Sequence, residues 1–106
     1  MEAMKLAGLE PQAVFTYFED ICSIPHGSYN TRAISDYLVE FAKEQGVRYV
    51  QDEAFNVVMF KEASPGYENA PVVMIQGHMD MVCEKNADSA HNFETDALEL
   101  RLVGDD

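Results

Sequence analysis

The feature that most constrains the fold is a run of four apolar residues, Val72-Val73-Met74-Ile75. A strand that is exposed on one face alternates apolar and polar residues, whereas a strand that is buried on both faces is apolar throughout. Strands of the second kind are typical of the centre of an α/β sheet, which is covered by helices. We therefore expect residues 72–75 to form a buried central strand and the chain to adopt an α/β fold.

Two helices are predicted before this strand. Pro11 suits the first turn of a helix, and apolar residues follow it at helical spacing. Pro25 should end this helix, because a proline disfavours helical geometry in the residue before it. Ser28 or Asn30 can cap a second helix, which carries an apolar stripe and stops at Gly46.

The remaining strand signals lie on either side of the apolar run. Residues 47–51 and 56–60 are short, β-branched and aromatic segments separated by a turn, which predicts a β-hairpin. Residues 98–103 alternate as a half-exposed strand does, and residues 104–106 read as a hairpin turn with no second strand after it. We expect residues 1–106 to be part of one truncated domain with no internal boundary; a frayed acidic tail is the alternative.

The charge balance excludes several classes of function. The chain has 7 Lys and Arg against 19 Asp and Glu, for a formal net charge of -12, and this surface would repel nucleic acids and anionic membranes.

No apolar run has the length of a membrane span, and no signal peptide is recognisable. Cys22 and Cys83 lie far apart, without the spacing of a disulfide framework or zinc knuckle. A cytoplasmic protein with reduced thiols fits best.

The candidate chemistry follows the apolar run directly, in the sequence Gly77-His78-Met79-Asp80. In open α/β sheets, ligands collect at the carboxyl ends of the strands. Residues two apart in extended backbone point to the same side, so His78 and Asp80 can touch. A carboxylate that accepts one ring N–H of a histidine fixes its tautomer and directs the other nitrogen at a metal. The pair is therefore a candidate metal contact.

Spacing alone leaves a structural role for His78 open, since a zinc site needs three or four ligands. The other two histidines are not spaced from His78 in a way that indicates a shared metal site. His26 is expected to be a loop or capping residue, and His91 a surface residue or secondary contact. Cys83 as a thiol nucleophile with His78 as its base is a weaker alternative, because residues five apart at a strand end do not favour that contact.

The order of these segments resembles the cytosolic aminoacyl-histidine dipeptidases (Xaa-His or β-Ala-His dipeptidases, carnosinase-like). They belong to a wider family of co-catalytic zinc peptidases and deacylases that includes the acetylornithine deacetylases. The resemblance runs through nearly the whole chain, and its most specific part is Gly77-His78-Met79-Asp80-Met81-Val82. Other parts are residues 14–26, 41–46 and 56–58, and residues 84–93 (EKNADSAHNF) resemble the dipeptidase branch in particular.

The resemblance implies an N-terminal fragment of a metallopeptidase catalytic domain that hydrolyses Xaa-His dipeptides with metal-activated water. At matching positions, His78 would ligate one of two zinc ions and Asp80 would be the active-site carboxylate that orients it. The other ligands, the general base and the segments for a homodimer would lie after Asp106, so the chain alone is expected to be inactive. The wider family often has proline at Cys83, which affects only the backbone after the motif.

Two other functions stay open. A metal-dependent deacylase of N-acyl amino acids would share the His-x-Asp motif, and a non-catalytic interaction module could carry a vestigial copy of it. Neither the dipeptide specificity nor the role of His91 follows from the residues.

Overall fold

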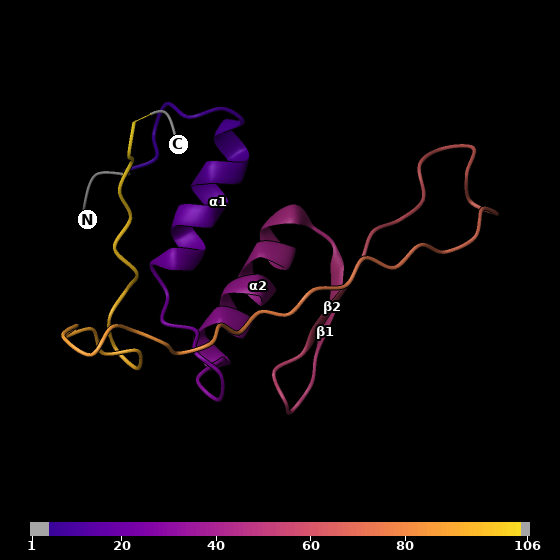
Figure 1. Ribbon diagram of the computed structural model, residues 1–106. Helices are drawn as coiled ribbons and strands as arrows, with labels where there is room; N and C mark the ends of the chain where they lie inside the picture. Colours follow the sequence, from indigo (N-terminus) through magenta and orange to yellow (C-terminus); the bar gives the residue numbers. More distant parts are fainter. Residues whose placement is uncertain (1–4, 105–106) are drawn as a thin grey trace.

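The computed structural model describes residues 5–104 and contains two helices followed by a two-stranded sheet (Figure 1). The elements are α1 (Gln12–Cys22), α2 (Arg32–Gln45), β1 (Arg48–Gln51) and β2 (Val57–Phe60). After β2 the chain continues without further helices or strands through residue 104. It forms a long loop, returns past the hairpin and α2, and ends beside α1, where the Leu98 amide donates to the Cys22 carbonyl at 2.9 Å.

Helix α1 is confirmed, one residue later than predicted. Pro11 is the residue before the helix, with φ -73° and ψ 127°, and the helix ends at Cys22, ahead of Pro25. Tyr17 of α1 packs edge-to-face on Phe41 of α2, with 5.3 Å between the ring centroids. This aromatic pair joins the two helices.

Helix α2 ends as predicted but does not begin as predicted. Gly46 terminates it in the left-handed conformation, with φ 69°, which glycine adopts without a steric penalty. Thr31 precedes its first turn and makes no side-chain capping bond, so the capping role predicted for Ser28 or Asn30 is wrong. The hydroxyl of Ser28 and the amide of Asn30 instead bond to residues far along the chain, Asp80 and Glu94 respectively.

The predicted hairpin is confirmed as the antiparallel pair β1–β2, in a register that places Val50 opposite Val58. Helix α2 covers it through Ser35, which is fully buried. The Ser35 hydroxyl donates to the Phe55 carbonyl at 2.7 Å and accepts from Gln51 Nε2 at 2.8 Å. The buried hydrophobic side chains of the described chain are few: Leu6, Cys22, Ile34, Val39 and Ala42.

The prediction of a buried central strand at residues 72–75 is wrong for this structure. The segment has no strand assignment, and its four side chains are 82–96% exposed. A strand requires a neighbour that satisfies its backbone N–H and C=O groups. Among residues 5–104, β1 and β2 pair only with each other, and no other segment makes backbone hydrogen bonds to residues 72–75.

Residues 98–103 also form no strand in the described part of the chain, for the same reason. Of the predicted turn at residues 104–106, Gly104 has a positive φ of 64°, and Asp105 and Asp106 lie outside the described residues. The two helices and the hairpin are thus a partial α/β fold without its central strand.

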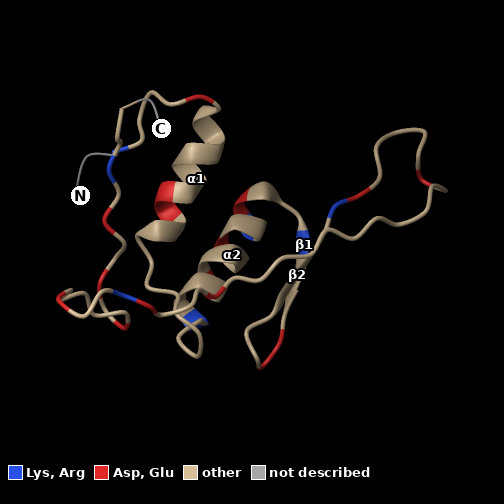
Figure 2. Ribbon diagram, in the orientation of Figure 1, with Lys and Arg blue, Asp and Glu red and all other residues tan. Residues whose placement is uncertain are grey.

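Charged residues are spread over both helices and the loops, but not over the extended segment before Asp80 (Figure 2). Residues 69–79 contain no Asp, Glu, Lys or Arg. Among residues 5–104, neither helix is long and apolar enough to cross a membrane.

Candidate functional site

The candidate site forms where the loop after α1 meets the segment that contains His78 and Asp80. Gly27 and Met81 make an isolated parallel bridge. The Met81 amide donates to the His26 carbonyl at 3.0 Å, and the Ser28 amide donates to the Met81 carbonyl at 3.1 Å. These two bonds bring together segments that are more than 50 residues apart.

The two segments approach closely at Gly27, which has no side chain to displace the neighbouring Cys83 side chain. A Cβ added to Gly27 would lie 2.3 Å from the Sγ atom of Cys83, and real Cβ atoms essentially never approach a neighbour so closely. The φ angle of Gly27 is not positive, so the constraint on this position comes from space and not from backbone conformation.

The contact that the sequence predicts between His78 and Asp80 is present. His78 Nδ1 lies 3.0 Å from Asp80 Oδ1 and 2.8 Å from the carbonyl oxygen of Asp80. Both neighbours of Nδ1 are acceptors, so Nδ1 is the donor, and in the neutral ring the lone pair lies on Nε2. The His78 side chain is 81% exposed, and among the described residues Nε2 has no hydrogen-bond partner. Nε2 is therefore available to a ligand from outside this chain.

Asp80 has a second partner that the sequence reasoning missed. The hydroxyl of Ser28 donates to Asp80 Oδ2 at 2.6 Å. This bond, and after it the bond from His78, lowers the pKa of the Asp80 carboxyl below its ordinary value. No local sequence pattern could reveal a partner 52 residues away; only the bridge between Gly27 and Met81 places Ser28 there.

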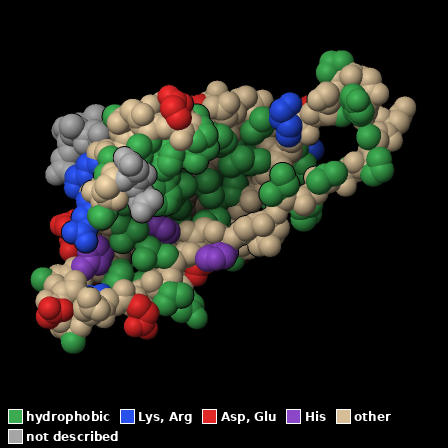
Figure 3. Space-filling model, turned by 45° about the horizontal axis from the view of Figure 1, so that its top comes forward, with side chains coloured by type: hydrophobic (Ala, Val, Ile, Leu, Met, Phe, Trp, Pro, Cys, Tyr) green, Lys and Arg blue, Asp and Glu red, His purple; other side chains and the backbone are tan. Residues whose placement is uncertain are grey.

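A hollow of about 490 Å³ opens beside the pair. It lies between the segment of His78 and Asp80, the residues just before α2 and the β1–β2 turn. Its lining consists of Tyr29, Thr31, residues 54–56 and residues 76–80. Histidine side chains lie on the same face of the molecule as the apolar surface over the helices (Figure 3).

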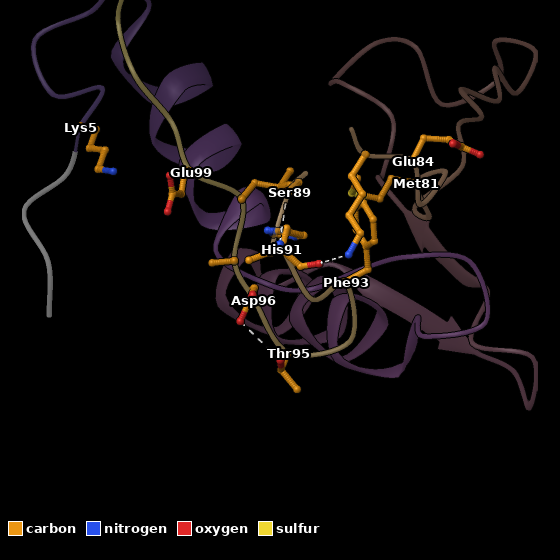
Figure 4. Close-up of a pocket in the computed structure, with 13 residues that line it drawn as sticks. Lys5, Met81, Glu84, Ser89, His91, Phe93, Thr95, Asp96 and Glu99 are labelled. Carbon is orange, nitrogen blue, oxygen red and sulfur yellow. Dashed lines mark hydrogen bonds between the residues drawn. The ribbon is translucent and has the colours of Figure 1, made fainter. Parts of the chain in front are cut away.

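The other two histidines differ in their surroundings. His26 is a buried loop residue, as expected, and its Nδ1 donates to the Ile24 carbonyl at 2.7 Å. His91 lines a separate cavity of about 910 Å³, together with Phe93 and Lys85 (Figure 4). Its ring packs edge-to-face on Phe93, and its buried Nε2 has no hydrogen-bond partner within residues 5–104, so it is more than a surface residue.

The cysteines do not support a thiol nucleophile. Cys22 is a buried free thiol, and burial, followed by the charge of Glu19, raises its pKa. Cys83 is exposed and lies against Gly27, with its Sγ atom 3.9 Å from the Met81 carbonyl oxygen. In the described part of the chain no hydrogen bond joins Cys83 to His78, so nothing activates the thiol through that histidine.

The side chains that could bind a metal at this site meet only part of what a metal needs. His78 offers an exposed, oriented nitrogen of the kind that binds zinc. Within residues 5–104, however, no group of three or more His, Cys, Asp or Glu side chains lies together as a metal site would need. Any metal held at His78 would therefore need its other ligands from outside the described residues.

Comparison with known proteins confirms the resemblance to dipeptidases. No protein-family model matches the sequence. The chain is 39% identical over 101 residues to the cytosol non-specific dipeptidase of Escherichia coli (strain K12), an alignment that covers 95% of this chain and 21% of that protein. Its fold matches the crystal structure of aminoacylhistidine dipeptidase from Vibrio alginolyticus with a TM-score of 0.85 and 39% identity, over 93% of this chain and 20% of that one. The chain thus spans about a fifth of the length of the proteins it matches.

Proposed function

We propose that this chain is the N-terminal segment of the catalytic domain of a zinc-dependent dipeptidase that hydrolyses Xaa-His dipeptides. The observation that carries the proposal is the geometry of His78. Its Nδ1 is held by Asp80 at 3.0 Å, and its Nε2 is exposed. The similarity to two dipeptidases over more than nine-tenths of the chain supports the same assignment.

In this proposal His78 would hold one of two zinc ions through Nε2, and Asp80 would keep the ring in the tautomer and orientation that this requires. When bound, zinc would supply an activated water and stabilisation of the negative charge on the scissile carbonyl oxygen. The hollow beside the pair gives a dipeptide access to His78. The other ligands and the general base would lie outside this sequence.

The remaining parts of the proposal concern the whole protein. It would act on dipeptides in the cytoplasm, as the name of the Escherichia coli relative suggests. It would form a homodimer through segments outside these 106 residues. The chain by itself should have negligible activity, because a single ligand cannot hold a catalytic zinc ion.

A chimeric enzyme tests the proposal. The matching segment of the Escherichia coli dipeptidase, which is 39% identical, is replaced by this chain. We expect the purified chimera to hydrolyse β-Ala-His in the presence of zinc. His78→Ala in the chimera should lower kcat/KM by at least about 100-fold, because the substitution removes a metal ligand. The control Ser64→Ala, at an exposed serine outside the hollow, should not.

A folded, zinc-loaded chimera without dipeptidase activity would contradict the proposal and favour a vestigial interaction module. If the chimera does not fold, a smaller graft of residues 72–83 into the same relative provides the test. Hydrolysis of N-acetyl amino acids in place of dipeptides would favour the deacylase.

A further inference from the structure

We propose that Ser28 is a positioning residue of this site: its hydroxyl holds the Asp80 carboxylate, which in turn holds the ring of His78. The inference rests on the proposed function, in which His78 binds a metal. The loop after α1, residues 23–28 (SIPHGS), would then help to orient the metal ligand, a role that its sequence does not suggest.

The two oxygens of Asp80 have different partners. Oδ1 accepts from His78 Nδ1 at 3.0 Å, and Oδ2 accepts from the Ser28 hydroxyl at 2.6 Å. The terminal torsion of an aspartate is broad, so one hydrogen bond alone leaves the plane of the carboxylate loosely defined. Bonds to both oxygens fix that plane. This matters here because Asp80 is 39% exposed, and water would otherwise compete for either oxygen.

Ser28 is itself held in place by backbone contacts. Its amide donates to the Met81 carbonyl at 3.1 Å, and the Met81 amide donates to the His26 carbonyl at 3.0 Å. The neighbouring Gly27 lies directly against the Sγ atom of Cys83. The hydroxyl is therefore presented by a docked segment of backbone and not by a free loop.

The consequence for His78 follows from the hydrogen bonds at Nδ1. With Asp80 fixed, Nδ1 keeps its proton between two acceptors, and Nε2 keeps the lone pair that a metal needs. Without the Ser28 hydroxyl, the carboxylate is free to turn toward water, and only the Asp80 carbonyl oxygen, at 2.8 Å, still accepts from Nδ1. Ser28 thus acts on the metal ligand through Asp80.

The test uses ¹⁵N NMR of the His78 imidazole in the 106-residue chain, at about pH 8, above the usual histidine pKa of about 6.5. The ring nitrogen shifts report the tautomer directly. We expect the Nδ1–H form in the parent chain and a mixture of tautomers in Ser28→Ala. Ser28→Thr, which keeps the hydroxyl, should retain the parent tautomer. Ser64→Ala, at an exposed serine outside the site, is the matched control.

A second variant covers the case in which Ser28→Ala fails to fold. Ser28→Cys keeps a side chain of similar size but replaces the hydroxyl by a weak donor, so it should behave as Ser28→Ala does. In the chimera described above, Ser28→Ala should lower kcat/KM by roughly 10-fold, which is typical when the partner of a metal-ligating residue is disturbed.

The outcomes separate the two proposals. A parent-like tautomer in both Ser28→Ala and Ser28→Cys overturns the role of Ser28, even if the chimera is an active dipeptidase. A changed tautomer, restored in Ser28→Thr, supports that role. If the tautomer changes in this way but the folded parent chimera is inactive, Ser28 still orients His78. In that case it is the dipeptidase assignment that is overturned.

Discussion

The hydroxyl oxygen of Ser28 lies 2.6 Å from Oδ2 of Asp80, although the two residues are 52 positions apart in the sequence. A bond of this length between a hydroxyl and a carboxylate belongs to the strong, charge-assisted class. It joins the loop after α1 to the segment of His78, so the geometry of the candidate site depends on two distant parts of the chain.

Removing the Asp80 side chain should weaken the site more than removing the Ser28 hydroxyl does. Asp80→Ala leaves His78 Nδ1 with only the backbone carbonyl as acceptor. We expect kcat/KM of the chimera for β-Ala-His to fall by about 10- to 100-fold, the usual effect of losing the partner of a metal-bound histidine. Asp88→Ala, at an exposed aspartate outside the hollow, serves as the control. Equal rates for both variants would contradict the role of Asp80.

A methyl group at position 27 should disrupt the docking of the two loops. Gly27→Ala places a Cβ atom 2.3 Å from Cys83 Sγ, and one of the two must move. We expect the free energy of unfolding to fall by about 1 kcal/mol, the low end for overpacked sites, because Cys83 is an exposed side chain that can rotate. Urea denaturation followed by circular dichroism measures this change. The double variant Gly27→Ala/Cys83→Ala, which removes the sulfur, should recover most of the loss, and a double variant as unstable as the single one would refute the steric explanation.

The buried hydroxyl of Ser35 should contribute measurably to stability. Ser35→Ala removes a donor from the Phe55 carbonyl and an acceptor from Gln51 Nε2. Leaving a buried polar group without its partner costs about 1–3 kcal/mol, so we expect a loss of that size in urea denaturation. Ser64→Ala, at an exposed serine, should change the free energy of unfolding by less than about 0.5 kcal/mol.

Tyr37 should make stability depend on pH under alkaline conditions. Burial, followed by the charge of Asp20 and the hydrogen bond to it, raises the pKa of Tyr37 to about 12. The ordinary tyrosine pKa is about 10, so the folded state favours the neutral phenol. The stabilisation is complete below about pH 10 and is lost as the pH rises from about 10 to about 12.

The titration of Tyr37 can be followed by the ultraviolet absorbance of tyrosinate, with Tyr37→Phe as the variant that removes it. The difference between the two titration curves should show one phenol that ionises above the ordinary tyrosine pKa of about 10. A difference curve centred at the ordinary tyrosine pKa would show that Asp20 and burial do not act on Tyr37.

The exposed segment at residues 72–75 should make the isolated chain self-associate. It is apolar on both faces, has no charged residue between positions 69 and 79 and has no backbone partner within the described chain. Segments of this kind template strand pairing between molecules. Val73→Lys should shift association to higher concentration in sedimentation velocity experiments. Val14→Lys, at an exposed valine of α1, should have a smaller effect, and equal effects would argue against pairing through this segment.

The sequence by itself determined the local elements and the contact within the motif. Apolar spacing and Pro25 predicted α1, Gly46 marked the end of α2, and β-branched residues marked β1 and β2. The two-residue period of extended backbone was enough to bring His78 and Asp80 together. Each of these features depends on neighbours only a few residues away, and for that reason they could be predicted from local patterns.

The tertiary structure alone decided which distant groups meet. It placed Ser28 on Asp80 instead of at the start of α2, and it made Gly27 the point of closest approach to Cys83. It also left residues 72–75 unpaired, although their composition is that of a central strand. An apolar run has the side chains of a buried strand, but it becomes one only when other segments satisfy its backbone hydrogen bonds and cover its faces, and residues 5–104 do not provide them.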